Sequence, residues 1–413
     1  MMLTMEAEMD WSKKKRKKIT VASVISGSGL VKAGGSNVVH GLYTRLAKYY
    51  DIEIVYLAPI IETYRKYEIA PGLWEIVIPK TQAHVDAEKK VTEKLKAQTT
   101  YDISLMYFLD KTPQYGNVLK HSIATSDIVF IERPYLFYEV RKHLNGRPLI
   151  QRSQNIEYFF RKSNIPESEE ANKILDDLFE LEKLCCESCV INFACSEEDL
   201  ETMHSMYGIP REKLKLLSNG VACEDNPFVS MEERVAIKKK YALGNEKIAI
   251  FIGGGHRPNM EACETILQAA PYCKDTKFIF AGNVCNELSR RERPQNVALL
   301  GLITEETRRF LFAVADVSLN PMYSGSGSNI KMFDYMAMGI PIISTKFGAR
   351  GISDISTFHI ADTVEELVDT INNFNCIDDK EAVIKARKLI EDEYDWKVLS
   401  LYVKGLIEQY MDN

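Results

Sequence analysis

The stretch SGSGSNIKMFDYMAMGIPIIST, residues 324–345, joins a glycine-rich turn to a helix and then to an apolar strand. Residues 329–338 contain no glycine or proline, which predicts the helix. Gly339 suits the left-handed position after its last turn, and Pro341 prevents the helix from continuing. The turn at 324–328 therefore leads into a helix N-terminus, where free N–H groups and the helix dipole favour an anion.

Apolar strands separated by helices recur on both sides of this stretch. In the C-terminal half the predicted strands are KIAIFIG, KFIFAG, VALLG, DVSLNP and IPIIST, at 247–253, 277–282, 297–301, 316–321 and 340–345. In the N-terminal half they are ITVASVIS, IEIVYLA, DIVFIE, PLIQRS and VINFACS, at 19–26, 52–58, 127–132, 148–153 and 190–196. This alternation predicts the α/β class, with two doubly wound parallel sheets whose carboxyl ends face a cleft.

The apolar pattern is interrupted by a charged segment around residue 224, and we expect the chain to divide there. The expected segments are a basic tail at 1–18, an N-terminal domain at 19–223, a linker at 224–246, a C-terminal domain at 247–394 and a final helix at 395–413. Asp395 is the predicted cap of that helix, and Ser196, with Asp199 three residues on, is the predicted cap of another.

Composition limits the possible partners. The 413 residues include 52 Lys and Arg against 58 Asp and Glu, and the resulting charge of −6 argues against nucleic acid. No apolar run approaches the roughly 20 residues of a membrane span, and the first residues lack a signal-peptide core. We therefore expect a cytoplasmic protein. The basic run from Lys13 to Lys18 is either a solvated tail or a patch that docks weakly on anionic lipid at the cytoplasmic membrane face.

The nine cysteines are an odd number and include no paired CxxC modules, which argues against a disulfide framework and a structural zinc site. Four of them cluster, namely Cys185, Cys186, Cys189 and Cys195. They follow a helical run and enter an apolar strand, so we expect them to be small core residues. The seven histidines show no ligand spacing either, and no metal is expected.

Three glycine-rich turns follow predicted strands, at 26–36, 253–259 and 324–328. Glycines at such turns often have only a steric reason. None of the three fits GxGxxG, and the strand at 52–58 ends without the acidic residue that a dinucleotide site places on its ribose. No GxxxxGK[ST] loop is present either. A dehydrogenase and a P-loop phosphotransferase are therefore both disfavoured.

Lys331 distinguishes the third turn from the other two. It lies in the first turn of the helix, where a lysine is unfavourable unless an anion offsets the positive end of the dipole. Arg257 follows the second glycine-rich turn, and its guanidinium is suited to bidentate phosphate contacts. Taken alone, both are more often solvated surface charges. Asp334, one turn further, could pair with Lys331 or accept hydrogen bonds from ribose hydroxyls.

The order of these parts resembles that of retaining GT-B glycosyltransferases of group 1, family 4. The resemblance rests on SQNIEYFF, FELEKLCCESCVINFACSEED, YGIPREKLKLLSNGV, FIGGGHRPN, LLGLITEE and GSGSNIKMFDYMAMGIPIIST, and it extends over residues 19–410. It implies that the N-terminal domain receives the acceptor, that the C-terminal domain binds a nucleotide sugar and that the final helix returns to the N-terminal domain.

The resemblance further implies a metal-independent hexosyltransferase without a cofactor. It would transfer a sugar from a nucleoside-diphosphate donor to a hydroxyl of a glycan, a lipid-linked acceptor or a small molecule, with retention. Lys331 and Arg257 would face the diphosphate, Asp334 the ribose, and Leu302 with Ile303 the base. The other implied donor-site residues are Gly254, Gly255, Gly325, Ser326, Gly327, Ser328 and Asn329. The implied acceptor-side residues are Gly34, Gly35, Ser36 and Gln154.

Several positions depart from the family pattern. Ser326 replaces the first of the family's two glutamates, and Gly254 and Asn259 replace an arginine and a lysine. Gln154 stands where many relatives carry histidine, and a glutamine cannot act as a general base, so the proton would pass to the leaving phosphate. Two alternatives stay open, which are a GT-B nucleotide-sugar epimerase and a binding scaffold without turnover. Conversion without acceptor would mark the first, and tight binding without turnover the second.

Overall fold

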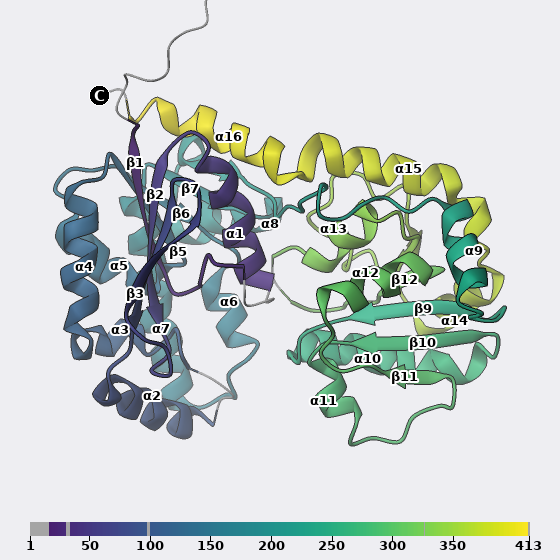
Figure 1. The fold of residues 1–413 in the computed structure, drawn as a ribbon. Helices are drawn as coiled ribbons and strands as arrows, with labels where there is room; N and C mark the ends of the chain where they lie inside the picture. Colours follow the sequence, from purple (N-terminus) through teal and green to yellow (C-terminus); the bar gives the residue numbers. More distant parts are fainter. Residues whose placement is uncertain (1–15, 30–33, 97–99, 326, 412–413) are drawn as a thin grey trace, which may run out of the picture.

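The protein is described by a computed structural model that covers residues 16–29, 34–96, 100–325 and 327–411. Lys13, Lys14, Lys15 and Ser326 lie outside the described residues. Two sheets, each with helices on both faces, stand side by side, and the last two helices run along the top of both (Figure 1).

The first sheet has eight strands in the order β3-β4-β2-β1-β5-β6-β7-β8. Their bounds are β1 Lys18–Ser23, β2 Asp51–Ala58, β3 Arg65–Ala70, β4 Leu73–Pro79, β5 Ile128–Glu132, β6 Leu149–Arg152, β7 Ile191–Ala194 and β8 Leu214–Leu216. The predicted strands are all present and pair in parallel. The prediction missed β3, β4 and β8, and β3 is antiparallel to β4 at the edge of the sheet.

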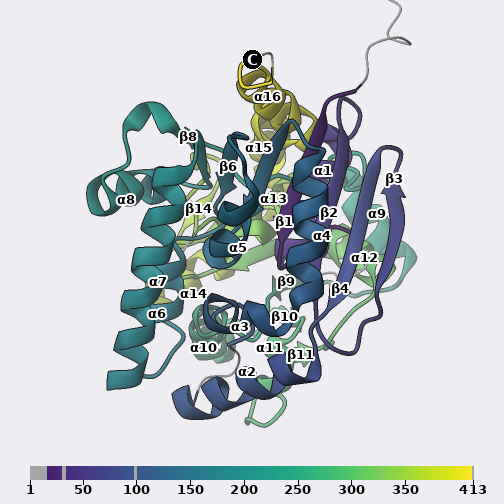
Figure 2. The ribbon, with the colours of Figure 1, turned by 90° about the vertical axis from the view of Figure 1, so that its left-hand side faces the viewer.

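Helices cover both faces of this sheet. They are α1 Gly34–Leu46, α2 Gln82–Leu95, α3 Leu105–Phe108, α4 Pro113–Ala124, α5 Phe137–His143, α6 Glu157–Lys162, α7 Glu169–Ser188 and α8 Glu197–Tyr207. Figure 2 shows α7, α5 and α4 across one face, with β3 at the edge. Helix α8 begins as predicted, because the Ser196 hydroxyl accepts the N–H of Asp199.

The second sheet has six parallel strands in the order β11-β10-β9-β12-β13-β14. They are β9 Lys247–Ile252, β10 Thr276–Ala281, β11 Val297–Leu299, β12 Val317–Asn320, β13 Ile342–Ser344 and β14 His359–Ile360. The helices are α9 Met231–Lys240, α10 Arg257–Ala269, α11 Val284–Leu288, α12 Glu305–Val314, α13 Ile330–Ala337, α14 Val364–Asn373, α15 Lys380–Leu389 and α16 Trp396–Glu408. Helix α13 ends as predicted, with Gly339 at φ 68°.

The segment 224–246 is not the linker that the sequence predicts. It contains α9, whose Arg234 is completely buried in the second domain. The guanidinium donates to the carbonyls of Phe312, Ala315, Met338 and Gly339. The chain passes between the domains earlier, since Leu217 N–H still bonds to the first sheet and Val221 N–H bonds to Tyr394 O.

The predicted basic tail at 1–18 is also too long, because Arg16, Lys17 and Lys18 belong to the first domain. Lys18 begins β1. Arg16 donates to Tyr50 O at 2.7 Å and Lys17 to Met411 O at 2.6 Å. All three side chains also form ion pairs, with Asp51, Asp127 and Glu53. The four clustered cysteines are buried, as predicted for small core residues, and Cys376 is the one of the nine that is only half-buried.

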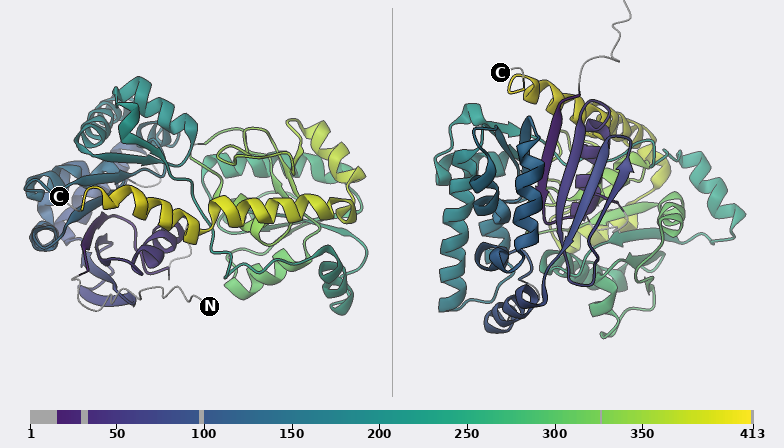
Figure 3. Two further views of the ribbon diagram at one scale, coloured as in Figure 1. Left: turned by 90° about the horizontal axis from the view of Figure 1, so that it is seen from above. Right: turned by 60° about the vertical axis from the view of Figure 1, so that its left-hand side comes forward.

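Helix α16 leaves the second domain and packs on the first. Trp396 and Val403 lie in one core cluster with Val21 and Leu42. Seen from the top, α16 lies over the first domain and continues the line of α15, which lies over the second (Figure 3). Gly41 of α1 makes this contact possible, because a Cβ atom there would lie 2.1 Å from Trp396 Nε1.

We expect Gly41→Ala to destabilise the protein although alanine is the better helix former. The added methyl group would displace Trp396, and overpacking of this kind typically costs about 1–3 kcal/mol. Gly405→Ala in α16 is the matched control. Its Cβ would meet no atom within 4 Å, so it should stabilise by roughly 0.5–1 kcal/mol. Denaturant unfolding measures both changes, and equal stabilisation by the two variants would contradict the packing described here.

Candidate active site

The two domains meet where the carboxyl ends of their strands face each other. A cavity of about 570 Å³ lies between them. Its first-domain wall comes from α6 and from the start of α8, and its second-domain wall from Gly325, Gly327, Phe347 and Arg350. The glycine-rich turn that precedes α13 is therefore part of the boundary between the domains.

Gly327 brings this turn against the first domain. Its φ is 64°, and a Cβ atom would lie 2.6 Å from the carbonyl oxygen of Gln154 and 3.2 Å from Cys195 Sγ. Beside it, Asn219 Nδ2 donates to Ser328 Oγ at 2.9 Å across the same boundary. The turn thus has a steric need for glycine in addition to any role in binding an anion.

Lys331 lies behind the turn and has no acidic partner. Its Nζ donates to Asn259 Oδ1 at 2.9 Å and lies 4.4 Å from the centre of the Phe251 ring. No ion pair joins it to a carboxylate among the residues that the structure describes. Burial lowers the pKa of Lys331 to about 7. A half-buried ammonium at the positive end of a helix dipole favours a bound anion.

Asn259 connects Lys331 to the second glycine-rich turn. Its Nδ2 donates to the carbonyl of Gly254 at 3.0 Å, while its Oδ1 accepts from the lysine. Gly254 and Gly255 are thereby placed on the same side of the cleft as Lys331. Asn259 stands where the resemblance implies a lysine, and nothing in the residue pattern indicated that its amide would hold Lys331 in place.

The structure does not bring Arg257 to this position. As the first residue of α10 it follows the outer side of the helix, and its Nε pairs with Glu261 Oε1 at 2.9 Å. Its side chain is 75% exposed. Glu261 also accepts from the hydroxyl of Ser324, so Arg257 borders the turn without facing Lys331.

Arg350 is the arginine that does lie at the turn, and the sequence analysis missed it. A Cβ atom on Gly325 would be 3.1 Å from its Nη2. The guanidinium stacks on the Phe347 ring at 4.3 Å, and burial lowers its pKa. The only sequence signal was the short GARG segment after β13.

Asp334 is paired with an arginine instead of with Lys331. Arg308 Nη1 lies 3.6 Å from Asp334 Oδ2, and the same guanidinium donates to Asn226 Oδ1 at 2.8 Å. The Asp334 side chain is half-buried. Of the two residues expected beside the base, Leu302 is exposed and Ile303 is half-buried against the second core.

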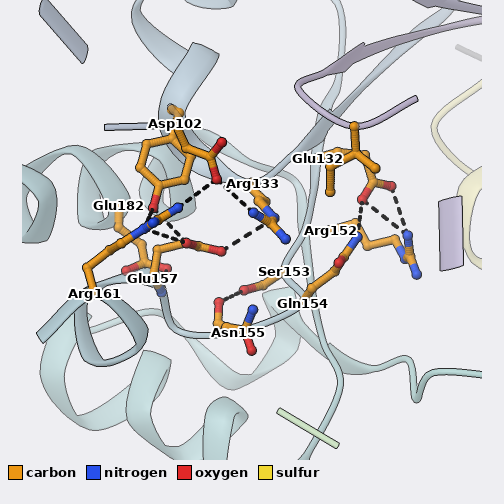
Figure 4. Close-up of polar contacts among 12 residues, drawn as sticks. Asp102, Glu132, Arg133, Arg152, Ser153, Gln154, Asn155, Glu157, Arg161 and Glu182 are labelled. Atoms are coloured by element: carbon orange, nitrogen blue, oxygen red, sulfur yellow. Dashed lines mark hydrogen bonds and ion pairs between the residues drawn. The ribbon is translucent and has the colours of Figure 1, made fainter. Parts of the chain in front are cut away.

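On the acceptor side the structure brings Gly35 and Gln154 together. Gln154 Nε2 donates to Glu132 Oε2 at 3.3 Å, and its Oε1 is 3.1 Å from the position of a Cβ on Gly35. Glu132 is itself held by Arg152 at 3.0 Å (Figure 4). It also accepts from the hydroxyl of Tyr43 at 2.7 Å. Ser36 is buried and donates to Ser26 O, so it supports the turn instead of facing the cleft.

A second charged group adjoins Gln154 and was not foreseen from the sequence. Asp102 Oδ2 accepts from Arg133 Nη1 at 2.8 Å and from Arg161 Nη2 at 2.6 Å. Glu157 faces both guanidiniums, at 3.6 and 3.9 Å, and accepts from the hydroxyl of Tyr135 (Figure 4). These residues are distant in sequence and carry no shared motif.

Glu182 of α7 fixes the start of α6 in this group. It accepts the N–H of Glu157 at 2.9 Å and that of Tyr158 at 3.1 Å. Burial and the neighbouring Glu157 raise the pKa of Glu182 to about 8. The N-terminal turn of α6, and with it the Glu157 carboxylate, therefore has a fixed position.

Sequence comparison matches the C-terminal half of the chain. Residues 246–374 match the family of group 1 glycosyl transferases. The alpha-galactosylglucosyldiacylglycerol synthase of Streptococcus pneumoniae is 26% identical over 127 residues. This alignment takes in 28% of the present chain and only 34% of that relative.

Structural comparison extends over nearly the whole chain. Sucrose-phosphate synthase from Thermosynechococcus elongatus has a TM-score of 0.73 at 14% identity, covering 96% of this chain and all of that one. The Anabaena protein Alr3699/HepE, in complex with UDP and glucose, has a TM-score of 0.66 at 11% identity over 95% and 100%. An E. coli trehalose-6-phosphate protein bound with UDP-2-fluoro glucose has a TM-score of 0.64 at 12% identity. That likeness covers 96% of this chain and 99% of the E. coli chain.

These likenesses define the fold class. The chain has the GT-B fold, with two Rossmann-like domains, and its C-terminal half resembles group 1 glycosyl transferases. Within the described residues, no helix combines the length and the apolar character that crossing a membrane requires.

The unpaired state of Lys331 predicts proton uptake when a nucleoside diphosphate binds. At pH 8 a lysine of pKa about 7 is mostly neutral, and an adjacent diphosphate raises its pKa by favouring the charged form. Binding at pH 8 should therefore take up close to one proton, and at pH 6 almost none. Calorimetry in buffers of different ionisation enthalpy measures this number. Lys331→Met should abolish the uptake, whereas proton-neutral binding by the wild type would exclude this role.

Proposed function

We propose that the protein is a glycosyltransferase that moves a sugar from a nucleoside-diphosphate sugar to a hydroxyl acceptor. The observation that carries the proposal is Lys331, a half-buried ammonium without a carboxylate partner at the N-terminus of α13. It lies within the region that matches group 1 glycosyl transferases. A leaving diphosphate would supply the missing negative charge, and the cation would stabilise that charge as it develops.

The remaining roles follow from the positions of the side chains. Asn259 holds Lys331 toward the diphosphate, and Asp334, oriented by Arg308, accepts from the ribose hydroxyls. Arg350 takes the phosphate role that the sequence analysis gave to Arg257. Leu302 and Ile303 border the base. No metal or cofactor is part of the proposed reaction.

The proton of the acceptor hydroxyl passes to the leaving phosphate in the proposed mechanism. Gln154 cannot accept it as a base, and the nearest carboxylate, Glu132, is fully buried in its pair with Arg152. If the leaving phosphate is the base, attack occurs on the face from which the phosphate departs, and configuration is retained. A nuclear magnetic resonance spectrum of the first product tests this step.

A uridine nucleotide is the first donor to test. Two structurally similar proteins were solved with UDP and glucose and with UDP-2-fluoro glucose. A thermal-shift panel of nucleoside diphosphates and their sugars identifies the base, since a ligand at 100 times its Kd adds about 2.7 kcal/mol to stability. If no nucleoside diphosphate stabilises the protein, the proposed function is wrong.

A binding scaffold without turnover is the second candidate, and Gln154 is the residue that favours it. Its amide is fixed by Glu132 in a position where many relatives carry histidine. Stabilisation by a nucleotide sugar, with neither transfer to a range of hydroxyl acceptors nor hydrolysis, would mark this class. Conversion of the donor without any acceptor would instead mark an epimerase.

Lys331→Met should lower turnover about 10²- to 10³-fold, as expected for loss of one preorganised charge at a leaving group. The same variant should lose most of the nucleoside-diphosphate stabilisation, while the unliganded protein keeps its melting temperature. Lys346→Met, at an exposed lysine near the cleft, is the control. Asp334→Asn should weaken nucleoside and nucleotide equally, because its contact is with ribose. If Lys331→Met keeps wild-type donor affinity and turnover, the phosphate site does not include Lys331.

A lipid acceptor would bring the protein to a membrane, and we propose that Lys13, Lys14 and Lys15 then provide a weak contact. Arg16, Lys17 and Lys18 are already in ion pairs and add little. The full chain should therefore sediment with anionic vesicles at low salt and lose this property as ionic strength rises. A protein lacking residues 1–15 should sediment less. Equal sedimentation of the two proteins would end the membrane proposal.

A further inference from the structure

Arg133 follows β5 at the edge of the first sheet that faces the cleft, and part of its guanidinium is unused. Nη1 donates to Asp102 and Nε faces Glu157. Nη2 donates to no residue that the structure describes. It lies 3.6 Å from the position that a Cβ on Gly35 would occupy, so it adjoins the start of α1 at Gly34 and Gly35.

The backbone of Arg133 is in a conformation that L-residues rarely adopt. Its φ is 69° and its ψ is 157°, in a region that is populated almost only by glycine. Pro134 follows and restricts ψ to the extended range. Strain of this kind persists where the surrounding structure enforces it, and it collects at binding sites. A glycine would adopt this backbone conformation at a lower cost in free energy, yet the position carries a long cationic side chain.

Gln154 presents an acceptor atom to the same space. Glu132 can only accept hydrogen bonds as a carboxylate, so it fixes the Gln154 amide with Nε2 toward the sheet. Oε1 is then 3.1 Å from the same Cβ position on Gly35 that lies 3.6 Å from Arg133 Nη2. Among the residues that the structure describes, neither Arg133 Nη2 nor Gln154 Oε1 has a hydrogen-bond partner. A donor and an acceptor from the ends of neighbouring strands β5 and β6 therefore flank one glycine.

We propose that Arg133 and Gln154 form an acceptor subsite for a hydroxyl compound that carries an oxoanion, either a phosphate or a carboxylate. Arg133 binds the oxoanion, and Gln154 Oε1 accepts from a hydroxyl group of the same molecule. This assignment rests on the proposed glycosyltransferase function. Arg133 is thus a specificity-determining residue, and it contributes no proton to the reaction.

The charge of Arg133 acts both within the first domain and across the cleft. Within the group, Arg133 and Arg161 are balanced by Asp102 and Glu157. Across the cleft, His256 nevertheless has a lowered pKa, first through burial and then through the charges of Arg161 and Arg133. The charges of the two arginines thus act on a group of the second domain.

The proposal is tested by binding of glucose 6-phosphate, glucuronate and glucose to the full chain, with and without a saturating nucleoside diphosphate. The wild type should bind at least one of the two anionic sugars more tightly than glucose. Arg133→Gln should weaken that anionic sugar about 10- to 100-fold, as expected for loss of a hydrogen bond to a charged group, and leave glucose unchanged. Arg133→Gly removes the same guanidinium and relieves the backbone strain, so it keeps the test valid if the glutamine variant unfolds.

Arg161→Lys is the matched control, because Arg161 belongs to the same charged group but its Nε and Nη2 are engaged with Tyr135 and Asp102. It should lower thermal stability and keep the preference for the anionic sugar. The proposal is overturned if the wild type shows no such preference or if both Arg133 variants keep it. It is also overturned if the Arg133 variants lose nucleoside-diphosphate affinity, since the oxoanion would then belong to the donor.

The outcomes separate this proposal from the proposed function. A wild-type protein that binds no nucleoside diphosphate but shows an Arg133-dependent preference for an anionic sugar would contradict only the transferase assignment. A protein that binds nucleoside diphosphate through Lys331 and shows no preference between charged and neutral sugars would contradict only the acceptor subsite.

Discussion

Two backbone hydrogen bonds hold together the two places where the chain passes between its domains. Val221 N–H donates to Tyr394 O at 3.0 Å, and Trp396 N–H donates to Val221 O at 3.1 Å. The outgoing and the returning segment are thus fixed side by side, which sets α16 on α1. The orientation of the two sheets, and with it the contact between the 324–328 turn and Gln154, depends on this double crossing.

The two walls of the cleft differ in how their charges are compensated. On the first-domain wall, Asp102 and Glu157 balance two arginines, and Glu132 balances Arg152. On the second-domain wall, Lys331 has an amide and an aromatic ring as its partners. A half-buried lysine without a counter-charge gives up its proton easily and regains it when an anion binds, so an anionic ligand acts mainly on the second wall.

Much of the fold was predictable because most of its strands are parallel and buried on both faces. Such strands are continuous apolar runs in the sequence. The strand β3, RKYEIA, escaped prediction because an edge strand needs no such run. Strand β4 contains Glu75, a fully buried carboxylate that accepts from Gly27 N–H and from Tyr67, and it interrupts the apolar pattern. Helix α9 was predicted as a linker because its sequence is mostly charged. The side chain that anchors it by hydrogen bonds in the second domain is an arginine, which in a sequence suggests exposure.

By itself the sequence determined the features that depend on neighbouring residues. These include the end of α13 at Gly339, the caps at Ser196 and Asp395, and the place of Lys331 in a first helical turn. Tertiary structure alone decided which charges face the cleft. Arg257 is turned to Glu261, Arg350 takes a place at the turn, and Gln154 is oriented by Glu132. Local backbone signals act within a few residues, whereas the direction of a charged side chain depends on partners and burial that come from distant parts of the chain.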